Sequence, residues 1–148
     1  MRTSVHIIEI TEFELLSSSA LGDRANMSAR HVLTQLRYDP SNPYAVVVRF
    51  ITPSGTVEWV ISRDLLAEGV HRPVGDGDVH LAPDGDRLRW TLRSPSGTAV
   101  LAAPLAALGA FVADTERIVP RGTEHRMVDL DAEIARLLRG GPPGGNAS

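Results

Sequence analysis

The chain has 148 residues, of which 43% are hydrophobic and 22% are charged. This length and composition are typical of one compact domain with its own core, and they exclude fibrous and largely disordered chains. The absence of cysteine excludes disulfide scaffolds, cysteine-ligated metal sites and thiol catalysis. With 15 basic and 18 acidic residues the net charge is −3, so the surface as a whole lacks the positive excess typical of nucleic-acid-binding proteins.

The sequence shows neither a signal peptide nor a membrane span. Glu9 and Glu12 precede any long apolar run, which is unlike a secretory leader. The longest apolar stretch, residues 99–113, contains Pro104 and Gly109 and is shorter than the about 20 residues that cross a bilayer. These features predict a soluble cytoplasmic protein.

The first third of the chain contains one clear strand. Residues 5–15 are rich in Ile, Thr and Phe and are predicted to be extended, and the serines at 17–19 are predicted to end this strand. Residues 17–36 have no clean period, so we expect a loop with a short strand or helical turn near 32–36. The two prolines within 39–43 predict a turn.

The next segment predicts a hairpin followed by a helix. Residues 44–51 are β-branched and aromatic, residues 53–55 form a Pro-Ser-Gly turn, and residues 56–61 return as a strand. A short helix is then expected over residues 63–68, capped by the serine before it and ended by the glycine after it.

The second half repeats this order. Residues 78–82 predict a short strand, and apolar and polar residues alternate over 87–93, which is the period of a half-buried strand. A second Pro-Ser-Gly turn leads into a strand over 98–103. A helix is predicted to begin at Pro104 and to end before Pro120.

The tetrapeptide Pro-Ser-Gly-Thr occurs at residues 53–56 and, 42 positions later, at residues 95–98. Internal duplication of a strand–turn–strand–helix unit and chance recurrence of a common turn both fit this match. Duplication predicts an α+β fold with two packed antiparallel sheets, each ending in a helix.

A last helix is predicted to start at Asp129 or Asp131 and to run to residue 139. Its apolar stripe consists of Leu130, Ile134, Leu137 and Leu138. We therefore expect a single domain over residues 1–139 and a flexible Gly/Pro tail over residues 140–148.

No pattern in the sequence predicts catalysis, a cofactor or a metal ion. Nucleophile motifs are absent, and a phosphate-binding loop would need a lysine that the chain lacks. The two Asp-Gly-Asp segments, 76–78 and 84–86, lack the distal Glu of a calcium loop and are explained by turns. Metal-site spacing is absent among the histidines, which are His6, His31, His71, His80 and His125.

Three arginines, Arg87, Arg89 and Arg93, lie on one face of a predicted strand. We interpret this stripe first as a solvated face, second as a surface for an acidic protein and third as a track for a nucleic-acid backbone. Only 5% of the residues are aromatic, which leaves few platforms for stacking bases.

Five separated strings carry a resemblance to a known family. They are LRYDPSNPYAV (36–46), VEWVISRDLLAEG (57–69), GDGDV (75–79), SPSG (94–97) and GTEHR followed by DLD (122–131). In this order they resemble the SsgA-like proteins, which are sporulation-specific cell-division proteins of filamentous actinobacteria. The resemblance spans residues 36–139.

The resemblance implies a cytoplasmic protein without enzymatic activity that acts at the sporulation septum. One branch of the family recruits the division GTPase FtsZ, and others act in wall synthesis, autolysis or spore separation. The implied fold is similar to the whirly single-stranded nucleic-acid-binding proteins, assembled as a trimer. The expected partners are FtsZ or other SsgA-like proteins, with no membrane insertion, and nucleic acid is not an expected partner.

Two of the matching strings contain charged residues that we take as candidates for a partner interface. The candidates are Arg63, Asp64, Gly122, Glu124, His125 and Arg126. Intramolecular caps or ion pairs are an equal alternative for the charged members, and Trp59 is expected in the core. Gly122 lies between two predicted helices, where a positive φ would let the chain reverse sharply.

Two functions follow from the sequence. The first is an adaptor of the division machinery that recruits or positions FtsZ or wall-synthesis proteins by protein–protein contact. The second is a single-stranded nucleic-acid-binding protein of whirly-like architecture, which rests on fold analogy alone.

Overall fold

A computed structural model of the chain describes residues 6–19 and 31–140. Within these residues the secondary-structure elements, in chain order, are β1 (Ile7–Ser18), β2 (His31–Tyr38), β3 (Ala45–Thr52), β4 (Gly55–Ser62), α1 (Arg63–Gly69), β5 (Val74–Asp76), β6 (Val79–Asp84), β7 (Arg87–Ser94), β8 (Gly97–Pro104), α2 (Leu105–Ile118) and α3 (Glu124–Gly140).

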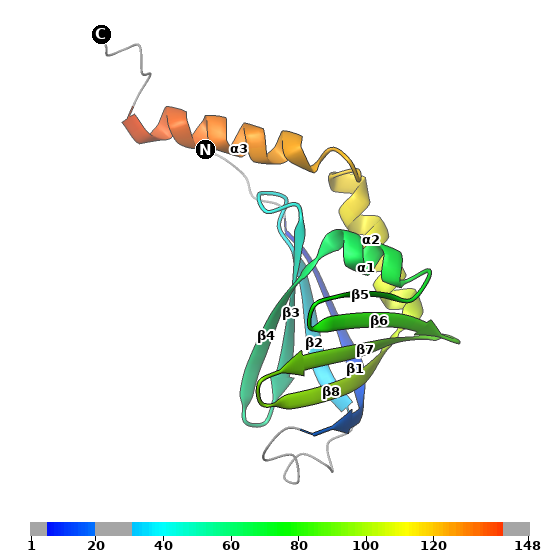
Figure 1. Cartoon of the computed structure of the whole chain (residues 1–148). Coiled ribbons are helices and arrows are strands. Elements are labelled where there is room, and N and C mark those ends of the chain that lie inside the picture. Colours follow the sequence, from blue (N-terminus) through cyan, green and yellow to red (C-terminus); the bar gives the residue numbers. More distant parts are fainter. Residues whose placement is uncertain (1–5, 20–30, 141–148) are drawn as a thin grey trace.

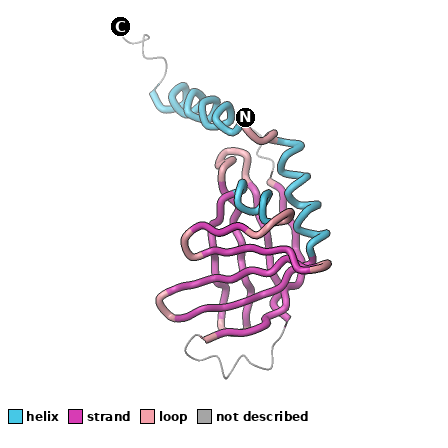
Figure 2. Tube along the Cα trace, turned by 45° about the vertical axis from the view of Figure 1, so that its right-hand side comes forward, coloured by secondary structure: helices cyan, strands magenta, loops and turns pink. Residues whose placement is uncertain are grey.

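The strands form one antiparallel sheet with the order β4-β3-β2-β1-β8-β7-β6-β5. The prediction of antiparallel strands accompanied by helices is therefore confirmed. The prediction of two packed sheets is wrong, because all eight strands belong to one sheet. Strand β1 pairs with β2 along one edge and with β8 along the other, which joins two four-stranded meanders into one sheet. The sheet curls into a half-barrel, so that the two meanders cross and face each other (Figures 1 and 2).

The two Pro-Ser-Gly turns close equivalent hairpins, β3–β4 and β7–β8. Gly55 has a φ of 136° and Gly97 a φ of 144°, values that glycine adopts without a steric penalty. In the first turn the Thr52 hydroxyl donates to the Gly55 carbonyl at 2.6 Å, and in the second the Ser94 hydroxyl donates to the Gly97 carbonyl at 3.5 Å. The same local chemistry thus builds both turns.

The strand register also repeats at the same offset of 42 positions. Phe50 lies opposite Val57 in the first hairpin, and Leu92 lies opposite Ala99 in the second. Each meander of four strands is followed by a helix, α1 or α2. The unit of strand, turn, strand and helix is thus repeated in the structure, while its origin by duplication stays a prediction.

Three elements differ from the sequence-based expectation. Strand β1 continues to Ser18 because its end pairs with β8 through a register shift between Leu15 and Ser17. Strand β2 occupies all of residues 31–38 where a short strand or turn was expected, because both its edges are paired. Strand β5 was not predicted, and residues 20–30 of the expected loop lie outside the described residues.

The helices begin and end close to their sequence signals, with one exception. The Ser62 side chain accepts a hydrogen bond from the Leu65 amide at 3.1 Å, which confirms it as the cap of α1. Helix α3 begins at Glu124 rather than at Asp129 or Asp131. Figure 1 shows α3 extending away from the curled sheet.

No helix in the described part of the chain combines the length and apolarity needed to cross a membrane.

One hydrophobic core lies between the two halves of the curled sheet. Phe13 of β1 is fully buried at its centre, with its ring 5.6 Å from that of Phe50 on β3 and 5.2 Å from that of Trp90 on β7. Strand β1 therefore supplies both the backbone link and the aromatic contact between the halves.

Replacing Phe13 with alanine should lower the free energy of unfolding by about 3–5 kcal/mol, because the cavity would lie where the two halves meet. Ile10→Ala, on the same strand but 59% exposed, should change it by about 0.5 kcal/mol or less. Urea unfolding followed by circular dichroism measures both values. Equal losses in the two variants would contradict the placement of Phe13 at the centre of the core.

Candidate functional site

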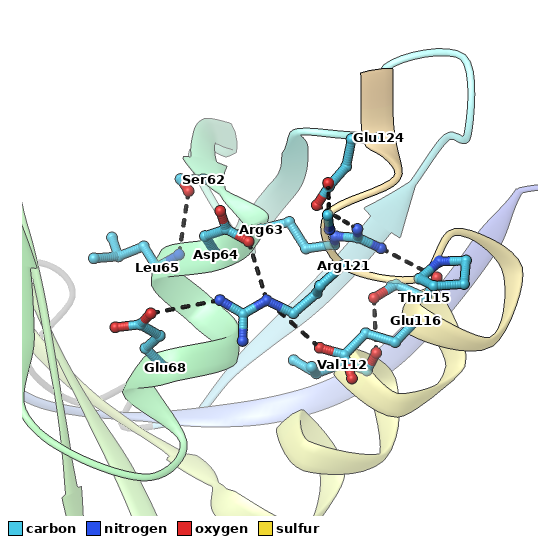
Figure 3. Close-up of polar contacts among 12 residues, drawn as sticks. Ser62, Arg63, Asp64, Leu65, Glu68, Val112, Thr115, Glu116, Arg121 and Glu124 are labelled. Atoms are coloured by element: carbon cyan, nitrogen blue, oxygen red, sulfur yellow. Dashed lines mark hydrogen bonds and ion pairs between the residues drawn. The ribbon is translucent and has the colours of Figure 1, made fainter. Parts of the chain in front are cut away.

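The six interface candidates lie at the start of α1 and at the turn from α2 into α3. Figure 3 shows Arg63, Asp64 and Glu124 at this junction. Arg63 and Asp64 open α1, Gly122 lies in the turn, and the remaining candidates open α3, namely Glu124, His125 and Arg126. Residues more than fifty positions apart in the sequence are thereby brought together, since Arg63 reaches Glu124 directly.

Arg63 lies at the centre of this junction and is 1% exposed. Its Nη1 donates to the backbone carbonyls of Thr115 at 3.2 Å and Val119 at 2.6 Å, which are carbonyls at the end of α2. Its Nη2 donates to the Glu124 Oε2 at 2.6 Å. One guanidinium therefore joins the start of α1, the end of α2 and the start of α3.

Glu124 supplies the negative charge that pairs with Arg63. Its other oxygen, Oε1, accepts a hydrogen bond from the Gly122 amide at 2.8 Å, and Gly122 has the positive φ of 90° expected from the sequence. Burial by itself would raise the pKa of Glu124, but the hydrogen bonds from Arg63 and from the backbone amides lower it below the ordinary value. The carboxylate thus stays ionised and holds α3 at its first residue.

Tyr38 is fully buried and packs against Arg63. The guanidinium of Arg63 lies 5.1 Å from the centre of the Tyr38 ring, within the range of a cation–π contact. The Tyr38 hydroxyl donates to the Pro43 carbonyl at 3.0 Å. Burial raises the pKa of Tyr38 to about 12, against an opposing effect of the Arg63 charge, so this hydroxyl stays protonated at neutral pH.

A second, half-exposed set of ion pairs surrounds Arg121, just after α2. Its guanidinium lies 3.2 Å from the Asp64 carboxylate, 3.4 Å from that of Glu68 and 4.0 Å from that of Glu116 (Figure 3). These contacts link α1 to α2 in solvent, where each is worth about 0–1 kcal/mol. Arg63 rather than Arg121 is therefore expected to dominate the energetics of the junction.

The six candidates thus divide into two groups. Arg63 and Glu124 are buried and contact each other, which corresponds to the alternative of an intramolecular ion pair. Asp64, Gly122, His125 and Arg126 are exposed on the rim of the junction, and Asp64 also forms an intramolecular ion pair, with Arg121. A role for any of the six in binding a partner stays a prediction.

Sequence reasoning missed Tyr38, Thr115, Val119 and Arg121 as members of the junction. One signal was present for Thr115, which shares a helical face with the apolar Leu108, Phe111 and Val112 and is fully buried. Its hydroxyl, however, donates to the Val112 carbonyl of the same helix at 2.7 Å, and only its backbone carbonyl contacts Arg63.

Other residues singled out in the sequence lie elsewhere. Trp59 is half-buried and packs against the core from β4. Two arginines of the stripe on β7 are paired, Arg87 with Glu14 at 3.0 Å and Arg89 with Asp84 at 3.1 Å, which reduces the charge offered to a polyanion. Within the described residues, no group of three or more His, Asp or Glu side chains could hold a metal ion.

Helix α3, which begins at the junction, carries several exposed apolar side chains. Leu130 is 54% exposed, Leu137 56% and Leu138 79%, and they lie on the apolar side of an otherwise charged helix. Figure 2 shows this helix leaving the junction away from the curled sheet. An apolar stripe of this kind is typical of a helix that packs against another surface.

Removing the guanidinium in Arg63→Ala should lower the free energy of unfolding by about 3–5 kcal/mol, because Glu124 would be left buried and charged without its partner. Arg121→Ala, which removes only half-exposed pairs, should cost about 1 kcal/mol or less. Urea unfolding compares the two variants, and amide hydrogen exchange should show loss of protection at the start of α3 in Arg63→Ala alone. Similar losses in both would contradict the central place of Arg63.

The Arg63–Glu124 pair also predicts a pH dependence. The pKa of Glu124 in the folded protein lies below its ordinary value of 4.5. The pair therefore contributes fully to the free energy of unfolding above pH 4.5, and this contribution is lost as the pH falls through the folded-state pKa. The difference in unfolding free energy between the wild-type protein and Glu124→Gln should therefore be constant near neutral pH and shrink below 4.5. A difference that stays constant into the acid range would show that Glu124 is not held ionised.

Comparison with known proteins places this chain in a family. Residues 32–124 match the sequence model described as "Streptomyces sporulation and cell division protein, SsgA". The sporulation-specific cell division protein SsgB of Streptomyces coelicolor is 50% identical over 108 residues, covering 70% of this chain and 79% of that protein. SsgB of Frankia casuarinae is 44% identical over 116 residues, covering 75% and 81%.

Solved structures agree with the sequences. A structure described under "Mutations in SsgB correlate to longitudinal cell division during sporulation of Streptomyces coelicolor" has a TM-score of 0.75 and 41% identity, covering 86% of this chain and 98% of that one. An SsgA-like sporulation-specific cell division protein from Thermobifida fusca has a TM-score of 0.77 and 30% identity, covering 93% and 99%. The chain therefore belongs to the SsgA family of sporulation and cell division proteins.

Proposed function

We propose that this protein is a non-enzymatic adaptor of sporulation-specific cell division, which positions septum machinery by protein–protein contact. The family and the relatives of this chain are named for sporulation and cell division, and the proposal starts from a role in that process. The proposal adds the mechanism, in which a cytoplasmic protein at the septum contacts FtsZ, a wall-synthesis protein or another SsgA-like protein.

The observation that carries the proposal is the exposed apolar stripe of α3. Leu137 and Leu138 expose more than half of their surface, although burying a leucine is worth about 1.5–3 kcal/mol. A helix that keeps such side chains outside its own core supports an intermolecular role.

The junction supports the same mechanism because it sets the direction of α3. The buried pair of Arg63 and Glu124 fixes the first residue of the helix, while Gly122 turns the chain just before it. A recognition helix held at its base loses less conformational freedom on binding than a free one. The exposed rim residues, Asp64, His125 and Arg126, lie beside this base and would contact a partner that covers it.

The same stripe is available for self-association. A homotrimer, implied by the family resemblance, would bury apolar helix faces in closed symmetry. Binding to single-stranded nucleic acid gains no specific support, because the arginines of β7 are largely paired with carboxylates and the net charge is negative.

The test is binding of purified protein to FtsZ polymers by co-sedimentation, with the oligomeric state measured by light scattering. Leu137→Asp should weaken partner binding or self-association roughly tenfold or more, because it places a charge on the apolar stripe. Ala132→Asp is the matched control, since it adds the same charge to the same helix on the opposite side and should bind like the wild type.

Three results would contradict the proposal. The first is wild-type behaviour of Leu137→Asp in both measurements. The second is the absence of binding to FtsZ, to septal wall-synthesis proteins and to other SsgA-like proteins by the wild type. The third is turnover of a substrate by the purified protein, since the mechanism proposed here makes and breaks no bonds.

A further inference from the structure

The two edges of the sheet differ in how well they are protected. Strand β5 closes one edge with only three residues, whereas β4 closes the other with eight (Figure 1). Strand β4 contains no proline and pairs with β3 without a register shift. Its one charged side chain, Glu58, is already paired with Arg49 at 3.0 Å. Strand β4 thus lacks the devices by which proteins block pairing at an exposed edge.

The backbone groups of β4 that face this edge can be identified from the ladder. The Arg63 amide donates to the Tyr44 carbonyl at 2.8 Å, so these two residues form a hydrogen-bonded pair next to the β3–β4 ladder. Hydrogen-bonded and non-hydrogen-bonded pairs alternate in an antiparallel ladder. The amides and carbonyls of Thr56, Glu58 and Val60 therefore point away from β3, and no strand within the described residues pairs with them.

The other half of the protein shows which structure fits such an edge. Strand β8 is the counterpart of β4 in the repeated register, and β1 pairs with its second edge in the antiparallel direction. In that pairing Leu15 of β1 lies opposite Leu101, whose counterpart on β4 is Trp59. An antiparallel strand beside β4 would thus take the place that β1 takes beside β8.

An apolar cavity lies under the inner side of the same edge. Its volume is about 260 Å³, and it opens between the ends of the two equivalent hairpins. Val57 and Trp59 of β4 line it together with the core residues Phe50, Leu92 and Leu101. Val57 is 49% exposed although it points to the inner face of the sheet. A strand paired with β4 would place its alternate side chains over Val57 and Trp59, at the mouth of this cavity.

We propose that the free edge of β4 binds an extended segment of a partner protein as an antiparallel strand. Main-chain hydrogen bonds to Thr56, Glu58 and Val60 hold the segment, and its inward-facing apolar side chains enter the cavity beside Val57 and Trp59. This mode of recognition takes affinity from the backbone and specificity from alternate side chains. The inference rests on the proposed function in taking a protein as partner, and it names a surface separate from α3.

The probe is a fluorescently labelled, end-blocked peptide with the sequence of residues 9–18, EITEFELLSS, because β1 is the strand that fills the equivalent edge of β8. The peptide should bind the full-length protein in an anisotropy titration and shift the emission of the half-buried Trp59 to shorter wavelength. Val60→Pro removes one outward amide without touching the β3–β4 ladder, and it should weaken binding roughly tenfold or more. Val60→Thr keeps this amide and is the matched control.

A second pair of probes tests the backbone contacts without altering the protein. Methylating the amides of either the odd or the even positions of the peptide removes the donors on one of its two edges. One version should lose binding and the other should keep it, because only one edge of the peptide faces β4.

The inference is overturned if the peptide fails to bind, if Val60→Pro binds it as tightly as Val60→Thr, or if both methylated peptides behave alike. Binding of the peptide as a compact ligand in the cavity alone would give the last two results. Should the peptide bind as expected while FtsZ and the other septal proteins do not, the proposed function fails and the strand site stands.

Discussion

A buried guanidinium has to find hydrogen-bond acceptors within the protein, and Arg63 finds them on both sides of the turn between α2 and α3. Two are backbone carbonyls at the end of α2, and one is the carboxylate that opens α3. Breaking this set would leave a charge in a site from which water is excluded, which is far more costly than leaving an exposed pair unmade. One side chain therefore joins all three helices, while Arg121 adds exposed ion pairs between α1 and the end of α2.

The double pairing of β1 is the corresponding constraint on the sheet. Because β1 pairs with β2 and β8, the two meanders form one curled sheet, and Phe13 is buried where they meet. The same arrangement makes the two halves unequal. Strand β8 has both edges paired, whereas its counterpart β4 has only one edge paired by a strand of residues 6–19 and 31–140.

Among the described residues, the stripe of α3 and the edge of β4 both leave apolar side chains accessible, and the two surfaces differ in physical character. The stripe of α3 offers side chains alone, since the backbone of a helix is satisfied internally. The edge of β4 offers backbone donors and acceptors together with an apolar cavity. A helix stripe recognises shape and hydrophobicity, whereas a strand edge recognises extended conformation, so the two surfaces suit different segments of one partner or two different partners.

Local signals in the sequence were sufficient for most of the elements. Alternation along residues 87–93, the two Pro-Ser-Gly turns and the Ser62 cap predicted their strands, hairpins and helix because each depends on neighbouring residues only. The family was also recognisable, since its five strings are short and retain their order. The exposed rim residues Asp64, His125 and Arg126 were found by the same strings, as were the buried Arg63 and Glu124.

What the sequence determined by itself was therefore the local conformation and the family, because turn chemistry, hydrophobic period and motif order are properties of contiguous residues. Tertiary structure alone decided that β1 joins the halves into one sheet, that α3 starts at Glu124 and that Arg63 is buried against it. These outcomes depend on pairings between residues 60 or more positions apart, such as Arg63 with Glu124 and Leu15 with Leu101. No local pattern specifies such a pairing, because its favourable free energy arises only when the fold brings two distant segments into contact.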